Sequence, residues 1–317
     1  MSSSTNPFVI ILIGPTGVGK TAVSCELAKQ LPEETEIISA DSRQVYRYMD
    51  IGTAKPSPQL REKITHHFID ACYPDRNYSA GEFGEEAREE IGKILARGHW
   101  PIVVGGSGLY LRALLEGFFA PKVSNQEIQA QLKRRAETEG SRQLHAELAK
   151  IDPGSAARLH PNDSHRIVRA LEIYYASGKP ASELRQYPNE PADFIYRLIG
   201  LNMPRADLYA RINQRVDKMV AEGLVDECKR LLEMGYLPEL NALKTVGYQE
   251  VFQHLRNEIS YDEMVELIKQ HSRNYAKRQM TWFRKMNGVK WFDVKPEDSA
   301  EKIAALLLLY LNISQAD

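Results

Sequence analysis

This 317-residue sequence has few cysteines and no apolar run long enough to cross a bilayer. The three cysteines, Cys25, Cys72 and Cys228, are an odd number without the close spacing of metal ligands, which argues against a disulfide framework or a zinc finger. Residues 303–311 are apolar, but such a stretch is too short to span a membrane. The first seven residues lack the basic start and apolar middle of a secretion signal. We therefore expect a cytoplasmic protein with reduced thiols and no membrane partner.

An excess of charge of either sign is also missing. The formal net charge is −1, while 43% of the residues are hydrophobic and 26% are charged, as in an ordinary soluble protein. A polyanionic partner would therefore have to bind a local basic patch rather than the whole surface. The length leaves room for two hydrophobic cores, so we expect one large domain with an insertion or a second lobe.

A glycine-rich segment follows the first apolar run. Residues 8–13 are apolar, residues 14–21 fit the pattern G-x-x-x-x-G-K-[ST], and residues 22–31 carry apolar side chains at helical spacing. Strand, turn and helix in this order predict a loop that cradles phosphate with backbone N–H groups and a helix N-terminus. A tight turn that only matches the pattern is the alternative. The residues predicted to bind a diphosphate or triphosphate are Gly14, Pro15, Thr16, Gly17, Val18, Gly19, Lys20 and Thr21, with Lys20 neutralising charge and Thr21 ligating Mg²⁺.

Strands and helices alternate through the first third of the chain. We predict strands at residues 36–40 and 101–104 and helices at 82–97 and 109–115, and the strand pattern resumes at 194–201. Further helices are expected at 208–222, 224–233, 248–255 and 261–284, with a last short strand near 291–294. Such alternation indicates a parallel sheet that binds ligands at the carboxyl ends of its strands. Gly14, Asp41 and Gly105 should therefore converge on one crevice.

The composition changes at Ala120-Pro121-Lys122, and residues 124–175 read as polar helices with a thin apolar stripe at Leu132, Leu144 and Leu148. We therefore predict an α/β fold with a parallel sheet of the P-loop NTPase type flanked by helices. Residues 1–120 and 196–317 would form the catalytic core, and residues 121–195 a helical insertion domain.

Asp41 stands directly after the second predicted strand. There its carboxylate would face a bound phosphate and accept a proton or bind Mg²⁺ through water, unless it only caps a turn. The strand at 102–104 ends in glycines rather than in the acidic metal partner that an ATP hydrolase needs. The segment Gly105–Tyr110 either presents the Ser107 hydroxyl and backbone N–H groups to a substrate or only permits a close chain crossing.

Residues 269–292 contain seven lysines and arginines and no acidic residue. Lys269, Arg273 and Lys277 recur every four residues and would share one helical face, with Tyr275, Trp282 and Phe283 among them. Basic and aromatic side chains together hold unpaired RNA. A solvated helix whose aromatic rings face the core is the alternative.

Arg211 and Arg215 are also four residues apart. One of them would reach the crevice and clamp a leaving diphosphate, or both would form surface ion pairs with Asp207 or Glu222. The sequence leaves open which arginine faces the crevice. A small-molecule or nucleotide kinase that uses Asp41 as its base remains the alternative activity.

The ordered motifs resemble the bacterial tRNA dimethylallyltransferases, the IPP transferase family, from about residue 9 to residue 291. They are Gly-Pro-Thr-Gly-Val-Gly-Lys-Thr at 14–21, Asp-Ser-Arg-Gln-Val-Tyr at 41–46, Asp-Ile-Gly-Thr-Ala-Lys-Pro at 50–56, His-His-Phe-Ile-Asp at 66–70, Gly-Gly-Ser-Gly-Leu-Tyr at 105–110, His-Pro-Asn-Asp at 160–163, Arg-Ala-Leu-Glu at 169–172, Val-Gly-Tyr at 246–248 and Lys-Arg-Gln-Met-Thr-Trp-Phe-Arg at 277–284. The sequence departs from the family pattern in two motifs: Ser107 stands where Thr is common, and Arg43 and Gln44 vary within the motif at 41–46.

The resemblance implies transfer of a dimethylallyl group from dimethylallyl diphosphate to N6 of adenosine 37, next to the anticodon in tRNAs that read codons starting with U. Asp41, Thr16 and Arg215 would be catalytic, Mg²⁺ the cofactor, and the insertion would grip the anticodon stem-loop. We expect a monomer. The implied tRNA-binding residues are Asp41, Ser42, Arg43, Gln44, Ser107, Asn162, Asp163, Ser164, His165, Arg166, Thr245, Val246, Gly247, Tyr248, Gln249, Glu250, Lys277, Arg278, Gln279, Met280, Thr281, Trp282, Phe283 and Arg284.

Overall fold

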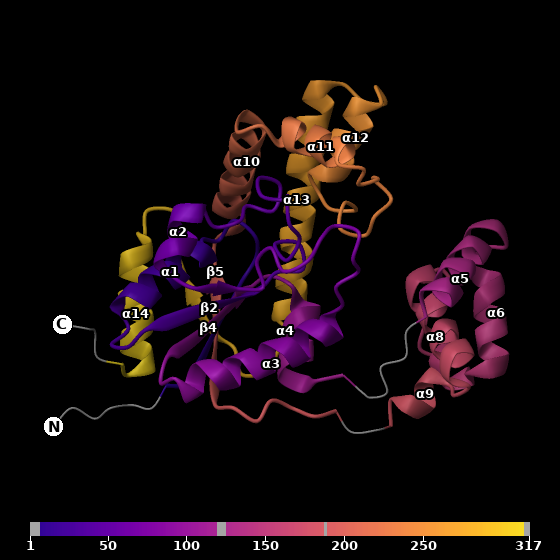
Figure 1. Ribbon diagram of the computed structural model, residues 1–317, viewed down its shortest axis with the longest axis horizontal. Coiled ribbons are helices and arrows are strands. Elements are labelled where there is room, and N and C mark those ends of the chain that lie inside the picture. The colour runs from indigo at the N-terminus through magenta and orange to yellow at the C-terminus, as the bar shows by residue number, and fades with distance from the viewer. Residues whose placement is uncertain (1–6, 119–124, 187–188, 314–317) are drawn as a thin grey trace. The chain divides into compact units, whose positions relative to one another are not determined.

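The computed structural model describes residues 7–118, 125–186 and 189–313, which form two compact units (Figure 1). The core unit comprises the described residues within Met1–Leu115 and Ala192–Asp317, and the insertion unit those within Glu116–Pro191. The change of composition at residues 120–122 lies outside the described residues. The chain thus leaves the core unit after Leu115 and returns to it at Ala192, before the fifth strand of the sheet.

Six parallel strands make the sheet of the core unit, in the order β3-β2-β4-β1-β5-β6. They are β1 (Val9–Ile13), β2 (Thr35–Ala40), β3 (His66–His67), β4 (Trp100–Gly105), β5 (Tyr196–Asn202) and β6 (Lys290–Asp293). The central strands are buried on both faces because helices cover both sides of the sheet, as the near-continuous apolar run of β1 requires. All strands point the same way, so their carboxyl ends meet at one edge.

Helices of the core unit lie between and after these strands. They are α1 (Lys20–Gln30), α2 (Pro58–Lys63), α3 (Ala80–Ala96), α4 (Gly108–Glu116), α10 (Arg205–Ala221), α11 (Leu224–Glu233), α12 (Tyr248–Leu255), α13 (Tyr261–Phe283) and α14 (Ala300–Leu311). Figure 1 shows α14 beside α1, with which it packs. None of the described helices is long and apolar enough to cross a membrane.

Side chains alternate between two hydrophobic layers, as the period of a strand requires. Ile11 and Ile13 of β1 join the layer that contains α3 and α4, whereas Ile10 and Leu12 join the layer that contains α1 and α14. Ser79 caps the start of α3 with a capping box. The Ser79 hydroxyl accepts from the Glu82 N–H, and the Glu82 carboxylate accepts from the Ser79 N–H. The sheet, with the carboxyl ends of its strands, is therefore held between two packed hydrophobic layers.

The insertion unit has a hydrophobic core of its own. Its helices are α5 (Gln126–Thr138), α6 (Ser141–Ile151), α7 (Pro153–Ala156), α8 (Ser164–Ser177) and α9 (Ala181–Leu184). The predicted stripe of Leu132, Leu144 and Leu148 is buried there against α8. Asp152 begins α7 by accepting from the Ser155 N–H, and its second oxygen accepts from Ser182. The short elements α2, β3, α7 and α9 were not predicted, because two to six residues carry too little periodicity.

Candidate functional site

The glycine-rich segment 14–21, called the phosphate cradle below, connects β1 to α1 at the carboxyl edge of the sheet. Gly17 and Gly19 have φ angles of 85° and 104°, a left-handed conformation that side chains disfavour. The left-handed Gly19 is the N-cap, so α1 begins at Lys20, two residues earlier than predicted. Thr21 therefore lies in the first turn of α1, and the positive helix end faces the cradle.

Lys20 folds back over the cradle. Its ammonium group donates to the carbonyl oxygens of Gly14 and Pro15, both at 2.9 Å. Burial lowers the pKa of Lys20 to about 8, the nearby positive charge of Arg215 acts in the same direction, and the negative charge of Asp41 opposes both. A bound anion would stabilise the charged form of this lysine.

Helix α10 brings both candidate arginines to the cradle. Arg215 Nη1 donates to the hydroxyl of Thr16 at 3.1 Å, and the pKa of Arg215 is lowered by burial while Asp41 opposes the shift. The guanidinium nitrogens of Arg211 lie 3.9 and 4.0 Å from the place that a Cβ on Gly19 would occupy. Within the described part of the chain neither arginine pairs with Asp207 or Glu222. The structure therefore answers a question that the sequence left open: both arginines face the cradle.

Asp41 follows β2 directly and caps the turn, which was the alternative role, while its catalytic role stays a prediction. Its Oδ1 accepts from the backbone N–H groups of Arg43 at 2.9 Å and Gln44 at 3.4 Å, which is the turn-capping role. Its charge also acts on the pKa values of Lys20 and Arg215. Among the described residues, no donor to Oδ2 is found. One carboxylate oxygen thus holds the turn, and the other is left for a ligand.

The glycine loop, residues 105–108, crosses close to the end of β2. A Cβ on Gly105 would lie 2.1 Å from the carbonyl oxygen of Ala40, so the close crossing is real. The Ser107 hydroxyl accepts from the Ser42 N–H at 2.9 Å and donates to the Ser42 hydroxyl at 3.2 Å. Ser107 is buried, so in this structure its side chain ties the two loops together rather than facing a substrate.

The loop that follows Asp41 is held by internal hydrogen bonds. The Arg43 guanidinium donates to the carbonyl oxygen of Asn241 at 2.7 Å. The Gln44 side chain accepts from Ser39 and donates to the carbonyl oxygens of Thr53 and Ala54. These two side chains therefore shape the loop, and direct contact with tRNA stays a prediction for them.

A buried carboxylate anchors the next turn of this loop. Glu227 of α11 accepts from three successive backbone N–H groups, those of Asp50, Ile51 and Gly52, at 2.8 to 3.1 Å. It also accepts from the Tyr248 hydroxyl at 2.6 Å. Tyr248 is fully buried and therefore cannot contact tRNA with its side chain as the resemblance implied.

The other residues of the 245–250 segment are divided between packing and capping. Glu250 is buried, accepts from the Gly247 N–H at 2.7 Å and bonds to His271, so it caps α12 and is removed from the tRNA contacts as well. The Thr245 hydroxyl donates to the Ala242 carbonyl oxygen at 2.6 Å. Gln249 is exposed and remains available.

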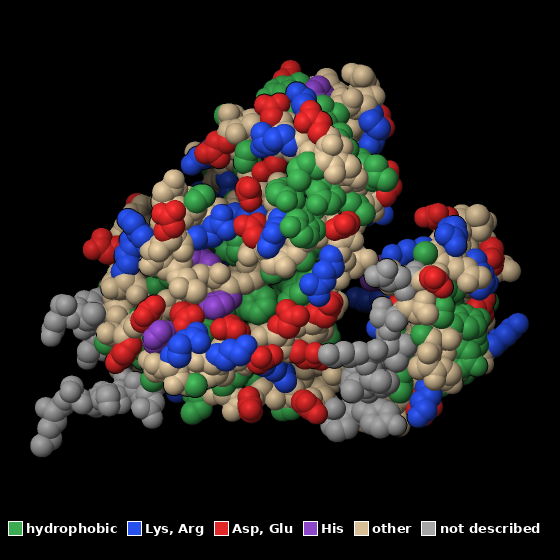
Figure 2. Space-filling view, viewed as in Figure 1, with side chains coloured by type: hydrophobic (Ala, Val, Ile, Leu, Met, Phe, Trp, Pro, Cys, Tyr) green, Lys and Arg blue, Asp and Glu red, His purple; other side chains and the backbone are tan. Residues whose placement is uncertain are grey.

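Helix α13 does not present one continuous basic face. Lys269 forms ion pairs with Asp217 of α10 at 2.8 Å and with Glu266 of α13. Arg273 donates to Asn213 of α10 at 2.7 Å, so both side chains have partners on α10. Their partners on α10 argue against an RNA-binding role for Lys269 and Arg273, and a face shared with Lys277 for RNA stays a prediction. Figure 2 likewise shows acidic and basic side chains intermixed over the visible face of the core unit.

The last turns of α13 carry the exposed cations. A groove of about 360 Å³ is lined by Asn274, Lys277, Arg278, Thr281, Trp282 and Lys285. A second groove of about 390 Å³ includes Arg205, Lys277, Met280, Thr281 and Arg284. Phe283 is fully buried, which excludes it from stacking on a base, whereas Trp282 is 38% exposed. Among the described residues of α13 and the two that follow it, the exposed basic and aromatic side chains that line these grooves thus lie within residues 274–285, and Arg205 of α10 adds to the second groove.

Two residues on the inner side of α13 have a role that the sequence analysis did not predict, because it assigned Gln279 to tRNA and Tyr275 to the RNA-holding aromatic set. Gln279 bonds to the phosphate cradle and to the glycine loop. The Tyr275 hydroxyl lies beside Ser107 and Asp41, and burial, followed by the charge of Asp41, raises the pKa of Tyr275 to about 12. Gln279 occupies a buried position between Ala276 and Phe283. A polar residue at the helical spacing of the apolar positions was the sequence signal that could have identified this buried role of Gln279.

The predicted tRNA contacts at residues 162–166 belong to the insertion unit. Asp163 caps α8 by accepting from the Arg166 N–H at 3.3 Å, while Asn162, His165 and Arg166 are exposed at the start of that helix. Exposed histidine and arginine side chains at a helix N-terminus suit a phosphate backbone. Their contact with tRNA stays a prediction.

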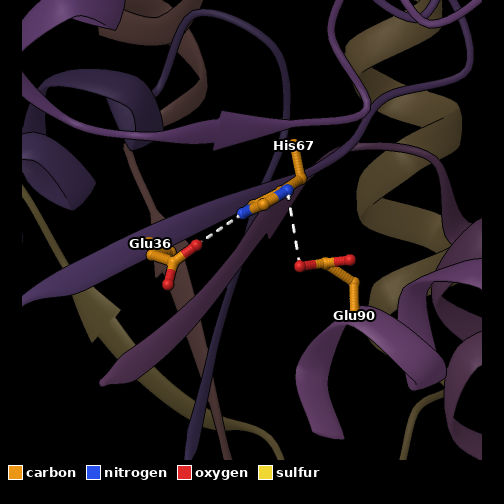
Figure 3. A group of neighbouring side chains, drawn as sticks. All are labelled: Glu36, His67 and Glu90. Atoms are coloured by element: carbon orange, nitrogen blue, oxygen red, sulfur yellow. Dashed lines mark hydrogen bonds and ion pairs between the residues drawn. The ribbon is translucent and has the colours of Figure 1, made fainter. Parts of the chain in front are cut away.

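Glu36, His67 and Glu90 lie close enough together for their ligand atoms to hold a metal ion (Figure 3). His67 directs Nε2 to Glu36 at 2.8 Å and Nδ1 to Glu90 at 3.9 Å, so its two nitrogens face different carboxylates. Burial opposes the ionisation of Glu36, but hydrogen bonds from Arg97, His67 and His99 lower its pKa to about 2. An ion-pair network between strands and α3 accounts for this group without a metal.

Comparison with known proteins places the chain among enzymes that act on tRNA. The sequence model of the family described as IPP transferase matches residues 44–286. A tRNA dimethylallyltransferase of Syntrophobacter fumaroxidans is 48% identical over 286 residues, which are 90% of this chain and 83% of that protein. One from Geobacter sulfurreducens is 45% identical over 300 residues, covering 93% and 95%.

Solved structures give the same result. The full-length tRNA isopentenylpyrophosphate transferase of Bacillus halodurans superposes with a TM-score of 0.68 at 38% identity, covering 97% of both chains. A eukaryotic dimethylallyltransferase crystallised acting on tRNA has a TM-score of 0.81 at 29% identity, covering 98% of this chain and 81% of that one. The phosphate cradle and Asp41 lie before the segment that the family model matches, so their roles rest on geometry.

Proposed function

This chain belongs to the IPP transferase family, and we propose that it transfers a dimethylallyl group from dimethylallyl diphosphate to N6 of adenosine 37 in tRNAs that read codons starting with U. The products are N6-isopentenyladenosine and diphosphate. The activity at the level of tRNA prenylation follows from the family. The base, the position and the residues that act are the proposal.

The observation that carries the proposal is the pairing of an anion cradle with a single carboxylate. Lys20, the loop amides and Arg215 surround one side, and the charge of Asp41 reaches Lys20 and Arg215 from the end of the neighbouring β2–β4 pair. An allylic carbon ionises readily once its leaving diphosphate is stabilised, so the enzyme gains most from preorganised positive charge. A single nearby base then suffices to take the proton from the adenine N6 that accepts the dimethylallyl group.

Thr16 is the hydrogen-bond donor best placed for the leaving group. Its hydroxyl oxygen accepts from Arg215 at 3.1 Å, and the hydroxyl hydrogen is therefore free to point toward the bridging oxygen of the donor. As the carbon–oxygen bond breaks, negative charge grows on this oxygen. Thr16 and Arg215 together stabilise that charge, and Lys20 with the backbone amides holds the outer phosphate.

Asp41 takes the proton from N6. The exocyclic amine becomes strongly acidic as its new bond to carbon forms, so a carboxylate of ordinary basicity can accept the proton. Oδ1 stays on the turn, which leaves Oδ2 to accept the N6 proton. The adenine leaves its stack to reach the donor carbon, at a cost of about a few kcal/mol that is least for a loop base.

The residues present fit a hydrated Mg²⁺. The Thr21 hydroxyl lies in the first turn of α1 and has no protein partner among the described residues, and Mg²⁺ is held in such sites by one or two protein ligands, water and phosphate oxygens. When bound, the ion neutralises diphosphate charge. Lys20 neutralises diphosphate charge with a positive charge that belongs to the protein itself.

The tRNA substrate would meet the groove lined by Lys277, Arg278 and Trp282, where cations contact phosphates and the exposed indole stacks on a base. Asn162, His165 and Arg166 form a separate exposed surface on the insertion unit for the anticodon stem-loop. We propose that the protein works as a monomer, since both substrates have a surface on one chain.

The experiment incubates the protein with an anticodon stem-loop RNA and either labelled dimethylallyl diphosphate or ATP labelled on its γ-phosphate. Nuclease digestion and mass spectrometry then locate the added mass. We expect prenyl on adenosine 37 only, and none on an RNA that carries guanosine there. Label transferred from ATP would establish a kinase, and prenyl at another nucleotide would refute the proposed position.

A further inference from the structure

A buried side-chain amide joins the two glycine-rich turns of the core unit. Gln279 of α13 is 6% exposed, its Oε1 accepts from the Thr16 N–H at 2.8 Å, and its Nε2 donates to the Gly106 carbonyl oxygen at 2.9 Å. A Cβ on Gly106 would lie 2.2 Å from Nε2. Glycine is therefore required at 106 because the amide of Gln279 fills the place of a side chain.

This contact decides how Thr16 is presented. The backbone N–H of Thr16 is committed to Gln279 and is not available to a phosphate, while the Thr16 hydroxyl bonds to Arg215. The main chain of Thr16 is thus fixed from α13 and its side chain from α10. Because Thr16 is held at its main chain and at its side chain, its hydroxyl stays in place and the loop need not reorganise when the donor binds.

The same two turns of α13 also carry the exposed residues Lys277, Arg278 and Trp282. The Trp282 ring lies 2.4 Å from where a Cβ on Gly108 would be, so it too packs on the glycine loop. Gln279 points inward between these outward residues. Its burial excludes the direct tRNA contact that the resemblance implied, and leaves its role with the donor.

We propose that Gln279 is a positioning residue for the donor diphosphate, holding the phosphate cradle and the glycine loop together so that Thr16 and Arg215 meet the leaving group. This inference rests on the proposed function for the identity of the donor. It does not rest on any RNA contact of Gln279.

The first test compares Gln279→Met with Gln270→Met. Methionine has nearly the shape of glutamine but cannot replace either hydrogen bond, and Gln270 is an exposed residue of the same helix. Binding of inorganic diphosphate is measured by calorimetry, alongside KM for dimethylallyl diphosphate and stem-loop RNA affinity. Two lost hydrogen bonds predict about a tenfold to hundredfold weaker diphosphate binding and a matching fall in kcat/KM for the donor. RNA affinity should stay within about twofold of wild type.

The second test is a double-mutant cycle between Gly106→Ala and Gln279→Ala. Alanine at 106 displaces the Gln279 amide, so this single variant should show the same donor defect although residue 279 is unchanged. In the Gln279→Ala background the space is empty, and the added methyl should cost little more. Strongly non-additive effects are expected. This pair keeps the proposal testable if Gln279→Met does not fold.

The outcomes separate this inference from the proposed function. Diphosphate affinity of Gln279→Met equal to that of Gln270→Met, or a loss of RNA affinity as large as the loss of diphosphate affinity, would overturn the positioning role. Additive effects in the double-mutant cycle would do the same. Failure of the wild-type protein to prenylate RNA would refute the proposed function instead, and the diphosphate measurements would still decide the role of Gln279.

Discussion

The protonation of Lys20 provides a test of the cradle that does not depend on turnover. In the free protein, burial lowers the pKa of Lys20 to about 8, helped by Arg215 and opposed by Asp41. Bound diphosphate favours the charged ammonium, so the pKa rises on binding and the complex takes up a proton. Donor affinity should therefore be constant below pH 8 and fall as the pH rises above it.

The size of the effect follows from the titration. A group with a pKa of about 8 is about 90% charged at pH 7 and about 10% charged at pH 9, which predicts about a tenfold rise in Kd between these values. The usual pKa of 10.5 would predict almost no change over the same interval. Tyr275 does not interfere, because burial and the charge of Asp41 raise its pKa to about 12.

Calorimetry of dimethylallyl diphosphate binding at pH 7 to 9, in two buffers of different ionisation enthalpy, measures both the affinity and the protons taken up. We expect about 0.9 proton per donor at pH 9. Lys20→Arg is the control, because its guanidinium stays charged throughout and any remaining pH dependence belongs to the ligand. A wild-type Kd that changes no more than that of the arginine variant would refute the reasoning.

Three further changes test other parts of the site. Asp41→Asn keeps an oxygen that can cap the turn but removes the base, so single-turnover transfer should fall by about a hundredfold or more while RNA still binds, and near-normal transfer would assign the proton to another group. Substituting glutamate for both Lys277 and Arg278 should weaken RNA binding and reduce its salt dependence, with the KM for the donor unchanged. A raised KM for the donor with unchanged RNA binding would show that the exposed groove is not the RNA surface. Glu227→Gln should lower the free energy of unfolding by about 1 to 3 kcal/mol in urea titrations, because an NH₂ group replaces one of the two buried oxygens that accept from three N–H groups and the Tyr248 hydroxyl. Tyr248→Phe should cost less, and an unchanged midpoint for Glu227→Gln would contradict the anchoring role.

Local patterns were sufficient for the elements that bury regular faces. The helix predicted at 248–255 has these bounds in the structure, and the apolar run at 8–13 forms β1 with one residue fewer. Strands β2, β4 and β5 likewise follow from their apolar content. Elements as short as β3 were missed, since pairing with a neighbour rather than periodicity stabilises them.

The phosphate cradle was visible in the printed sequence because its glycines, its lysine and its threonine are consecutive, and local backbone geometry alone sets their relation to the helix end. Packing alone decided three features: the placement of both Arg211 and Arg215 at the cradle, the division of residues 269–285 into paired and exposed cations, and the bond from Gln279 to Thr16. Each depends on which helix lies against which loop, between residues separated by up to 263 positions. Such contacts are set by the shape of the whole core, and no local spacing encodes them.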